Sequence, residues 1–155
     1  MDQLEKNMIR EARIEDIPHI LKIIHESIRT CIDDHQRDES SIQILLEEMN
    51  QANLTLWMLY NDSWVYVDEY RIAGVIMVND QGNILLNYVA PEMQLCGFGE
   101  ALLLKLFETC HTKNIPQLTL ESTQTALPFY QKYGFERTQP SNSDSMLLVK
   151  QVSPL

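Results

Sequence analysis

The stretch Tyr88–Gly99, YVAPEMQLCGFG, together with the leucine-rich run Glu100–Cys110 that follows it, decides the fold expected for this chain. It predicts an apolar strand, an exit marked by Pro91, a loop with Gly97 and Gly99 one residue apart, and then a helix. A glycine loop that opens a helix lets backbone N–H groups approach an anion closely, and the helix N-terminus adds partial positive charge. The stretch therefore indicates a site that suits a pyrophosphate.

Taken alone, this loop is equally well explained as an ordinary strand-to-helix turn, because two glycines one residue apart are a weak signal. It is not a dinucleotide fingerprint, since Ala101 and Leu102 stand where G-x-G-x-x-G requires its third glycine. It is not a Walker loop either, because no G-K-[ST] follows. The loop needs support from a second motif.

Length and composition predict one domain over residues 1–155. The chain is 45% hydrophobic and 22% charged, which is typical of a soluble globular protein. No apolar run approaches the roughly 20 residues of a membrane span, so we expect no membrane association. Met1–Arg10 has no apolar signal-peptide region, and three cysteines without C-x-x-C spacing imply neither a disulfide framework nor a zinc site. We therefore expect a cytoplasmic protein.

The acidic balance bears on possible partners. A formal net charge of −10 argues against a nucleic-acid partner, because neutralising phosphates requires a basic face. The charge agrees with a cationic ligand drawn in by the field of the protein, although solubility alone explains it as well.

The N-terminal half predicts a strand over Met8–Arg13 and then two helices. Asp16 is placed to cap the first helix, and Ser40 or Ser41 the second. Each helix has one apolar face, formed by Ile17, Ile20, Leu21, Ile24 and Ile28 in the first and by Ile42, Leu45, Leu46 and Met49 in the second.

The remaining patterns predict a mixed sheet. Strands at Trp64–Asp68, Ile72–Val78 and Ile84–Val89 form an antiparallel meander, with turns at Glu69–Arg71 and Asn79–Asn83. After the leucine-rich helix, Leu118–Glu121 reads as a strand that completes a βαβ unit, so it should run parallel to Ile84–Val89. A short helix around Ala126, Phe129, Tyr130 and Tyr133 ends at Gly134, and two strands follow in Phe135–Val152. The fold class is α/β (α+β), with a largely antiparallel sheet and helices on its faces.

The second motif lies in Thr123–Phe135, which contains A-x-x-F-Y-x-K-x-G-F. With the glycine loop upstream, the chain resembles the GNAT N-acetyltransferase superfamily from about Met8 to Val149. In that family a Q/R-x-x-G-x-G/A loop binds the coenzyme A pyrophosphate, and the later motif carries a catalytic tyrosine. The resemblance implies the GNAT fold, which is a mostly antiparallel six- to seven-stranded mixed sheet with a central βαβ unit and helices on both faces.

By resemblance, acetyl-CoA is the co-substrate. The strand end Tyr88–Val89 would splay from its neighbour and bind pantetheine and the acetyl group, with the Val89 N–H stabilising the oxyanion. Leu95 and Cys96 depart from the glycine and basic residue of many relatives, so backbone donors would hold the pyrophosphate. The full set of expected cofactor-binding residues is Tyr88, Val89, Gln94, Leu95, Cys96, Gly97, Phe98, Gly99, Glu100, Thr123 and Phe129.

The resemblance assigns Tyr130 as the catalytic residue. It would act as the general acid that protonates the leaving sulfur when an amine attacks the thioester directly. The alternative is that Tyr130 is a core residue beside Ala126 and Tyr133, and Tyr133 itself is expected to serve packing.

The acceptor site and the general base are less well marked. Asp33, Asp34 and His35 lie in the segment between the first two helices, and that segment usually borders the acceptor pocket in relatives. Glu121 lies on the strand beside the expected cleft. Each is a substrate-binding or base candidate, with a solvated surface group as the alternative. No His, Cys or carboxylate spacing suggests a metal.

These features together predict an acetyltransferase that moves an acetyl group from acetyl-CoA to a primary amine of a small molecule or peptide. The acidic charge favours a cationic acceptor, such as a polyamine, an aminoglycoside-like molecule or a lysine side chain. Two alternatives are a non-catalytic acyl-CoA-binding or regulatory module on the same fold, and a nucleotide-binding regulatory domain. Members of the family often form homodimers, but no interface is evident in the sequence.

Overall fold

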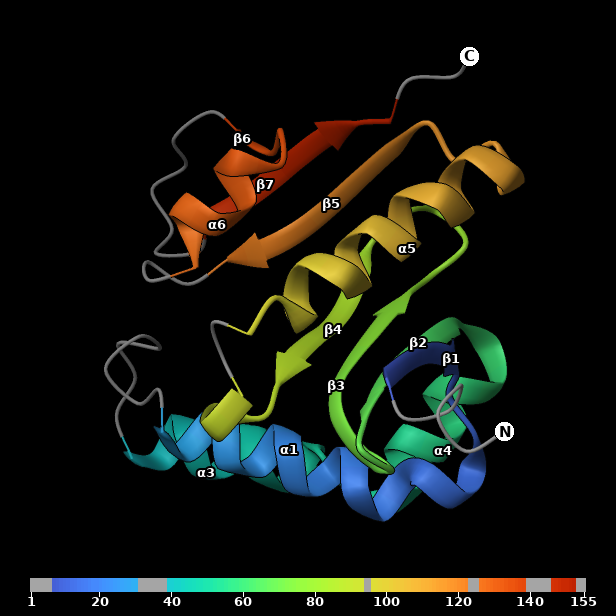
Figure 1. Ribbon diagram of the computed structural model, residues 1–155. Helices are drawn as coiled ribbons and strands as arrows, with labels where there is room; N and C mark the ends of the chain where they lie inside the picture. Colours follow the sequence, from blue (N-terminus) through green and yellow to red (C-terminus); the bar gives the residue numbers. More distant parts are fainter. Residues whose placement is uncertain (1–6, 31–38, 94–95, 123–125, 139–145, 153–155) are drawn as a thin grey trace.

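The computed structural model describes residues 7–30, 39–93, 96–122, 126–138 and 146–152. The strands in these ranges form two hydrogen-bonded sheets (Figure 1). The first sheet has four strands paired in chain order: β1 (Asn7–Glu11), β2 (Asp62–Asp68), β3 (Arg71–Val78) and β4 (Ile84–Val89). The second has three strands, in the spatial order β5 (Gln117–Ser122), β7 (Met146–Gln151) and β6 (Glu136–Arg137).

Within each sheet all neighbouring strands are antiparallel, which confirms the predicted meander of β2, β3 and β4. The turn between β2 and β3 contains Glu69 and Tyr70, both with positive φ, 49° and 73°. Two successive left-handed residues match the right-handed twist of the flanking strands, which is why such turns close hairpins. The first predicted strand, Met8–Arg13, ends two residues earlier than expected, because β1 stops at Glu11.

Among the described residues, one backbone bridge connects the two sheets. Asn83 forms a parallel bridge with Thr119, and the Thr119 N–H donates to the Gly82 carbonyl at 2.9 Å. This confirms that β5 runs parallel to β4, as a βαβ unit requires. The expected single sheet is instead divided, because β4 diverges from β5 beyond this bridge (Figure 1).

The end of β4 is hydrogen-bonded to the first helix. The hydroxyl of Ser27, buried on α1 (Ile17–Thr30), donates to the Val89 carbonyl at 3.2 Å. A carbonyl that is satisfied by a helix side chain does not need a β5 partner. This gives a physical reason for the divergence of the two strands.

One face of the first sheet is covered by α1 together with α3 (Glu39–Glu48) and α4 (Gln51–Tyr60) (Figure 1). The predicted apolar stripe of α1 is buried, with Leu21 partly buried beside it. The buried members of this cluster include Ile17, Ile20, Ile24, Ile28, Ile42, Leu46, Met49, Leu54, Val65, Val75, Met77 and Leu86.

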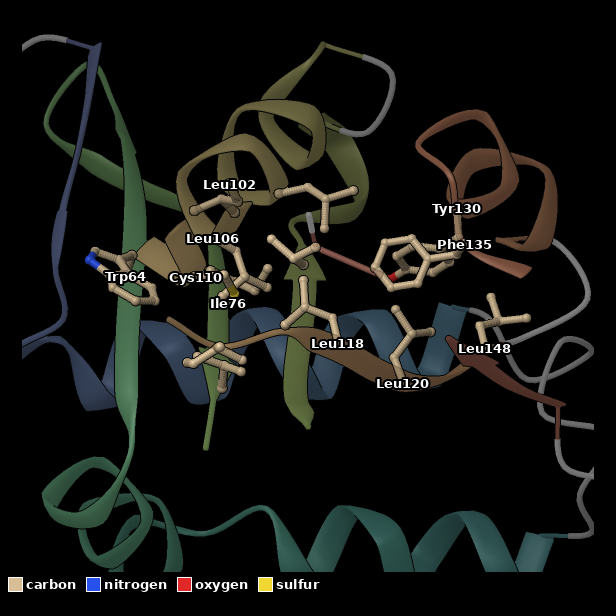
Figure 2. Packing of buried hydrophobic residues seen from close by; sticks show 14 residues of the cluster. Trp64, Ile76, Leu102, Leu106, Cys110, Leu118, Leu120, Tyr130, Phe135 and Leu148 are labelled. Carbon is tan, nitrogen blue, oxygen red and sulfur yellow. The ribbon is translucent and has the colours of Figure 1, made fainter. Parts of the chain in front are cut away.

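The opposite face packs against α5 (Phe98–Lys113), and the hydrophobic cluster on this face includes Tyr130 of α6 (Leu127–Lys132), which lies beside the second sheet (Figure 1). Their cluster extends from Trp64 at one end to Tyr130 and Phe135 at the other, and it joins the two sheets (Figure 2). Helices therefore cover both faces, as the fold class requires. The sequence pattern had also placed the short helix correctly, and Gly134 after it has a φ of +94°.

Further local expectations differ from the structure. Ser40 and Ser41 lie inside α3, which already contains Glu39, so neither residue caps it. The helix α4 was not anticipated, because its apolar residues do not gather on one side: Leu54 is buried, whereas Leu59 and Tyr60 are exposed. Asp16 does not cap α1; its carboxylate accepts from the Arg13 N–H at 2.7 Å and from the Arg10 guanidinium at 2.7 and 2.9 Å. Burial disfavours the charged carboxylate, but these hydrogen bonds outweigh it and lower the pKa of Asp16.

In the described ranges the helices are all too short or too polar to span a bilayer.

Candidate active site

Tyr130 lies where the two sheets part. Its ring is 7% exposed and makes edge-on contacts with Phe129, at a centroid distance of 5.2 Å, and with Phe135, at 5.5 Å. Figure 2 shows Tyr130 beside Phe135. Its hydroxyl accepts a hydrogen bond of 2.7 Å from the side-chain amide of Asn87 on β4. The ring thus packs as a core residue does, while the hydroxyl reaches β4, the strand that diverges from β5 of the second sheet.

The acid–base property of Tyr130 follows from this environment. Burial raises the pKa of Tyr130 to about 12, although the hydrogen bond from Asn87 acts in the opposite direction. The phenol is therefore protonated at physiological pH and has a proton to donate.

A pH-dependent stability follows from this pKa. The unfolded phenol ionises near pH 10, whereas the folded one holds its proton to about pH 12, so the unfolding free energy falls as the pH rises between these values. The loss should reach about 2–3 kcal/mol. Urea unfolding at pH 9 and pH 11.5 measures it, and Tyr130→Phe should show a smaller loss because other groups titrate equally in both proteins. An identical loss in both would contradict the assignment.

The backbone of β4 presents every second residue toward the side of β5. The Ala90 N–H donates to the Ala73 carbonyl at 2.7 Å, so these two residues form a hydrogen-bonded pair. Two residues earlier on β4, Tyr88 pairs with Val75 and forms the next hydrogen-bonded pair, while Val89 lies between the two pairs. In an antiparallel ladder the intervening residues direct their N–H and carbonyl groups away from the partner strand. The Val89 N–H therefore faces away from β3.

The helix α5 begins close above this strand end. A Cβ on Gly74 of β3 would lie 3.0 Å from Leu102 Cδ1 and 3.1 Å from the Tyr88 carbonyl oxygen, so only glycine fits without a shift. The Val89 side chain fills the space between Gly74 and Gly99. This packing brings the start of α5 next to Val89.

The glycine loop has the backbone that its sequence predicts. Gly97 is the N-cap of α5 with a φ of +86°, a conformation that strains other residues. As glycine it offers no capping side chain to the first-turn N–H groups. Cys96 is exposed beside it, whereas the expected contributors Gln94 and Leu95 lie outside the described residues.

The side chains of Phe98 and Glu100 both interact with other elements of the protein. The Phe98 ring stacks on Tyr66 of β2 with centroids 4.3 Å apart, so the backbone of Phe98 is the part available to a ligand. Partial burial and the Glu100 carboxylate both raise the pKa of Tyr133, which links the first turn of α5 to α6. Tyr133 also packs on Phe129 at 5.2 Å, in line with its expected packing role.

The expected acceptor residues are less well placed. Thr123, Asp33, Asp34 and His35 lie outside the described residues. Glu121 is exposed on β5, and side chains alternate along a strand, so it lies on the opposite face from Leu120, which belongs to the cluster around Tyr130. The structure does not bring Glu121 and Tyr130 together.

The sequence analysis missed the polar residues that hold this region. Asn87 and Ser27 were not singled out, although Asn87 interrupts the apolar strand ILLNYV, where asparagine is disfavoured. That mismatch was an available signal for Asn87. Ser27 gives no such signal, because a serine on a helix is unremarkable in sequence.

Within the described ranges, the His, Cys, Asp and Glu side chains form no group of three that could hold a metal ion. His25 Nε2 instead bonds the Met49 carbonyl oxygen at 2.7 Å, and His19 and His111 are exposed. These three histidines lie on α1 and α5.

Comparison with known proteins finds similarity to acetyltransferases. Residues 32–149 match the acetyltransferase (GNAT) domain family. A chloroplastic GCN5-related N-acetyltransferase 1 of Arabidopsis thaliana is 28% identical over 116 residues, which are 74% of this chain and 55% of the relative. This chain therefore spans about half the length of that curated relative.

Two solved structures share the fold over nearly their whole length. The PaiA N-acetyltransferase from Thermoplasma acidophilum, crystallised with coenzyme A, has a TM-score of 0.85 at 20% identity, covering 94% of this chain and 98% of that one. A GCN5-related N-acetyltransferase from Rhodopseudomonas palustris has a TM-score of 0.83 at 17% identity, covering 94% and 96%. At such identities the likeness concerns the fold alone. The match over residues 32–149, with this fold behind it, shows that the chain belongs to the GNAT acetyltransferase family.

Proposed function

We propose that this chain is an acetyl-CoA-dependent N-acetyltransferase that acts on a primary amine, with residues 1–155 as one domain and Tyr130 as the general acid. The observation that carries the proposal is the buried phenol of Tyr130, protonated at physiological pH and placed where β4 leaves β5. A packing residue would not need its hydroxyl at that point.

The cofactor site of the proposal runs from the strand end to the helix start. The backbone of Gly97–Glu100 would bind the pyrophosphate, since the N-cap Gly97 leaves the first-turn N–H groups without a side-chain cap from itself. Tyr88 and Val89 would bind pantetheine and the acetyl group, and Phe129 would border the site from α6. Gln94, Leu95, Cys96 and Thr123 complete the proposed set.

The chemical step uses the proton of Tyr130. The amine nitrogen attacks the thioester carbon, and the carbonyl oxygen takes up the π electron pair, which the Val89 N–H would stabilise. When that pair returns, the carbon–sulfur bond breaks and its electrons leave with the sulfur. Tyr130 gives its proton to this sulfur, and the surplus proton of the nitrogen passes to a base or water. Solvent then reprotonates the phenolate.

The acceptor is proposed to be cationic, because the chain has a net charge of −10. For the base, Asp33, Asp34, His35 and Glu121 stay candidates. A cytoplasmic location and a homodimer also stay predictions of the sequence.

The test combines binding with turnover. Calorimetric titration with coenzyme A should show one site per chain, and mass spectrometry should detect acetylated products after incubation with acetyl-CoA and a library of amines. Turnover of neutral or acidic amino acids only would remove the cationic acceptor. Binding without turnover would instead favour the regulatory acyl-CoA module, and tighter binding of ATP or NAD than of coenzyme A a nucleotide-binding domain.

A pair of glycine variants tests the loop. Gly97→Ala should cost about 1–2 kcal/mol of stability and weaken coenzyme A binding at least about tenfold, because alanine resists the φ of +86° that orients the loop. Gly99→Ala is the matched control: its Cβ would meet Val89 and Phe129 at 3.6 and 3.7 Å, which is ordinary contact. Calorimetry measures both. Equal affinities of the two variants would contradict the role of Gly97.

A further inference from the structure

Among the residues that the structure describes, Asn87 is the polar partner of the Tyr130 hydroxyl, and it makes this contact across the junction between the two sheets. Its side-chain nitrogen donates to the hydroxyl oxygen at 2.7 Å, over a separation of 43 residues. Asn87 is half-buried on β4, and its neighbours in the strand are apolar except for the Tyr88 phenol. An asparagine costs strand propensity at such a place, so a specific contact is needed to explain it.

The direction of this bond determines where the phenol proton points. A phenol oxygen carries one proton and accepts hydrogen bonds through its lone pairs. Since the Asn87 amide occupies the accepting side, the proton must point away from Asn87. The aromatic neighbours Phe129 and Phe135 fix the plane of the ring but not the rotation of its hydroxyl.

We propose that Asn87 is a positioning residue, which holds the Tyr130 oxygen and directs its proton toward the space where β4 and β5 diverge. This inference rests on the proposed function, in which the departing sulfur takes that proton. Asn87 itself gains or loses no proton in the step; it donates a hydrogen bond throughout and also stabilises the transient phenolate.

A double-mutant cycle tests whether Asn87 acts through Tyr130. Asn87→Leu should lower kcat about tenfold, with the KM for acetyl-CoA within about threefold, because the proton loses its preferred direction. In the Tyr130→Phe background the same change should have no further effect. Equal effects of Asn87→Leu in both backgrounds, or no effect in the native one, would overturn the proposal.

The matched control is Asn61→Leu. Asn61 lies between α4 and β2 and is also half-buried. Its side-chain nitrogen donates a hydrogen bond to the Trp57 carbonyl at 2.8 Å. It should leave kcat unchanged. A loss of kcat in Asn61→Leu equal to that in Asn87→Leu would reduce the effect to general destabilisation and overturn the specific role.

Asn87→Asp covers the case in which the leucine variant folds poorly. Aspartate is nearly the same shape but accepts hydrogen bonds, so it should capture the phenol proton and lower kcat about 10²-fold. A kcat close to that of the native protein would overturn the proposal.

A spectroscopic signature separates this inference from the proposed function. In nuclear magnetic resonance spectra without any ligand, the Asn87 side-chain amide signals should move when Tyr130 becomes phenylalanine, whereas those of Asn61 should stay. Unmoved Asn87 signals would refute the contact even if the enzyme is active. Moved signals in a protein without turnover would refute the proposed function and with it the positioning role, while the contact itself would stand.

Discussion

Tyr130→Phe is expected to lower kcat for acetyl transfer by ~10²–10⁴, while the affinity for acetyl-CoA changes less than about threefold. The variant keeps the ring that packs against Phe129 and Phe135 and removes only the hydroxyl. Without its proton, the sulfur has to leave as a thiolate or wait for a proton from water. Steady-state kinetics with an accepted amine, alongside calorimetry with acetyl-CoA, separates the two quantities.

The matched control for this variant is Tyr133→Phe. Tyr133 is three residues further along, also packs on Phe129, and interacts with Glu100 rather than with Asn87. It should keep nearly all of the native kcat. If Tyr130→Phe retained more than about half of the native kcat, or if both variants lost activity equally, the role of general acid would not hold.

The loss of the hydroxyl also has a structural cost that the kinetic experiment must account for. The half-buried Asn87 amide loses its acceptor, and an unsatisfied buried donor costs about 1–3 kcal/mol. Thermal unfolding of the variant therefore belongs with the kinetics. A modest fall in Tm with unchanged acetyl-CoA affinity would leave the fall in kcat as a chemical effect.

Gly82→Ala is expected to have the largest effect on stability, a loss of about 2–5 kcal/mol. Its φ is +89°, and a Cβ there would lie 2.0 Å from the Gln117 carbonyl oxygen, so the backbone of β5 would have to move. Gly82 also accepts the Thr119 N–H, at the point where the two sheets join. Chemical denaturation measures the loss, and reduced protection of the Thr119 amide from hydrogen exchange would locate it.

Gly97→Ala is the matched control for Gly82→Ala. Its φ of +86° imposes the same backbone strain, but within the described part of the chain no non-neighbouring atom lies within 4 Å of the position of its Cβ. The difference between the two variants therefore isolates the clash with β5. Equal losses of stability would mean that the strain of the glycine backbone, and not the approach of the two sheets, accounts for both.

Much of the fold could be predicted because its signals are local. The apolar stripe of α1, the strands β2 to β4 and the glycine loop before α5 all lie within short windows, and each followed the expected bounds within a few residues. The helix α4 was missed because it has no such local signal: its apolar residues form no stripe. Burial of Leu54 in the cluster with the α1 isoleucines stabilises it instead.

By itself, the sequence determined the loop around Gly97 and the placement of Tyr130 on a short helix, because backbone conformation and apolar periodicity are properties of neighbouring residues. Only the tertiary structure decided that the sheet divides after Gly82, that Ser27 holds the end of β4, and that Asn87 meets the Tyr130 hydroxyl. These contacts join residues 36 to 62 positions apart. Their partners are selected by the packing of helices on both faces of the sheet, which no short window of sequence contains.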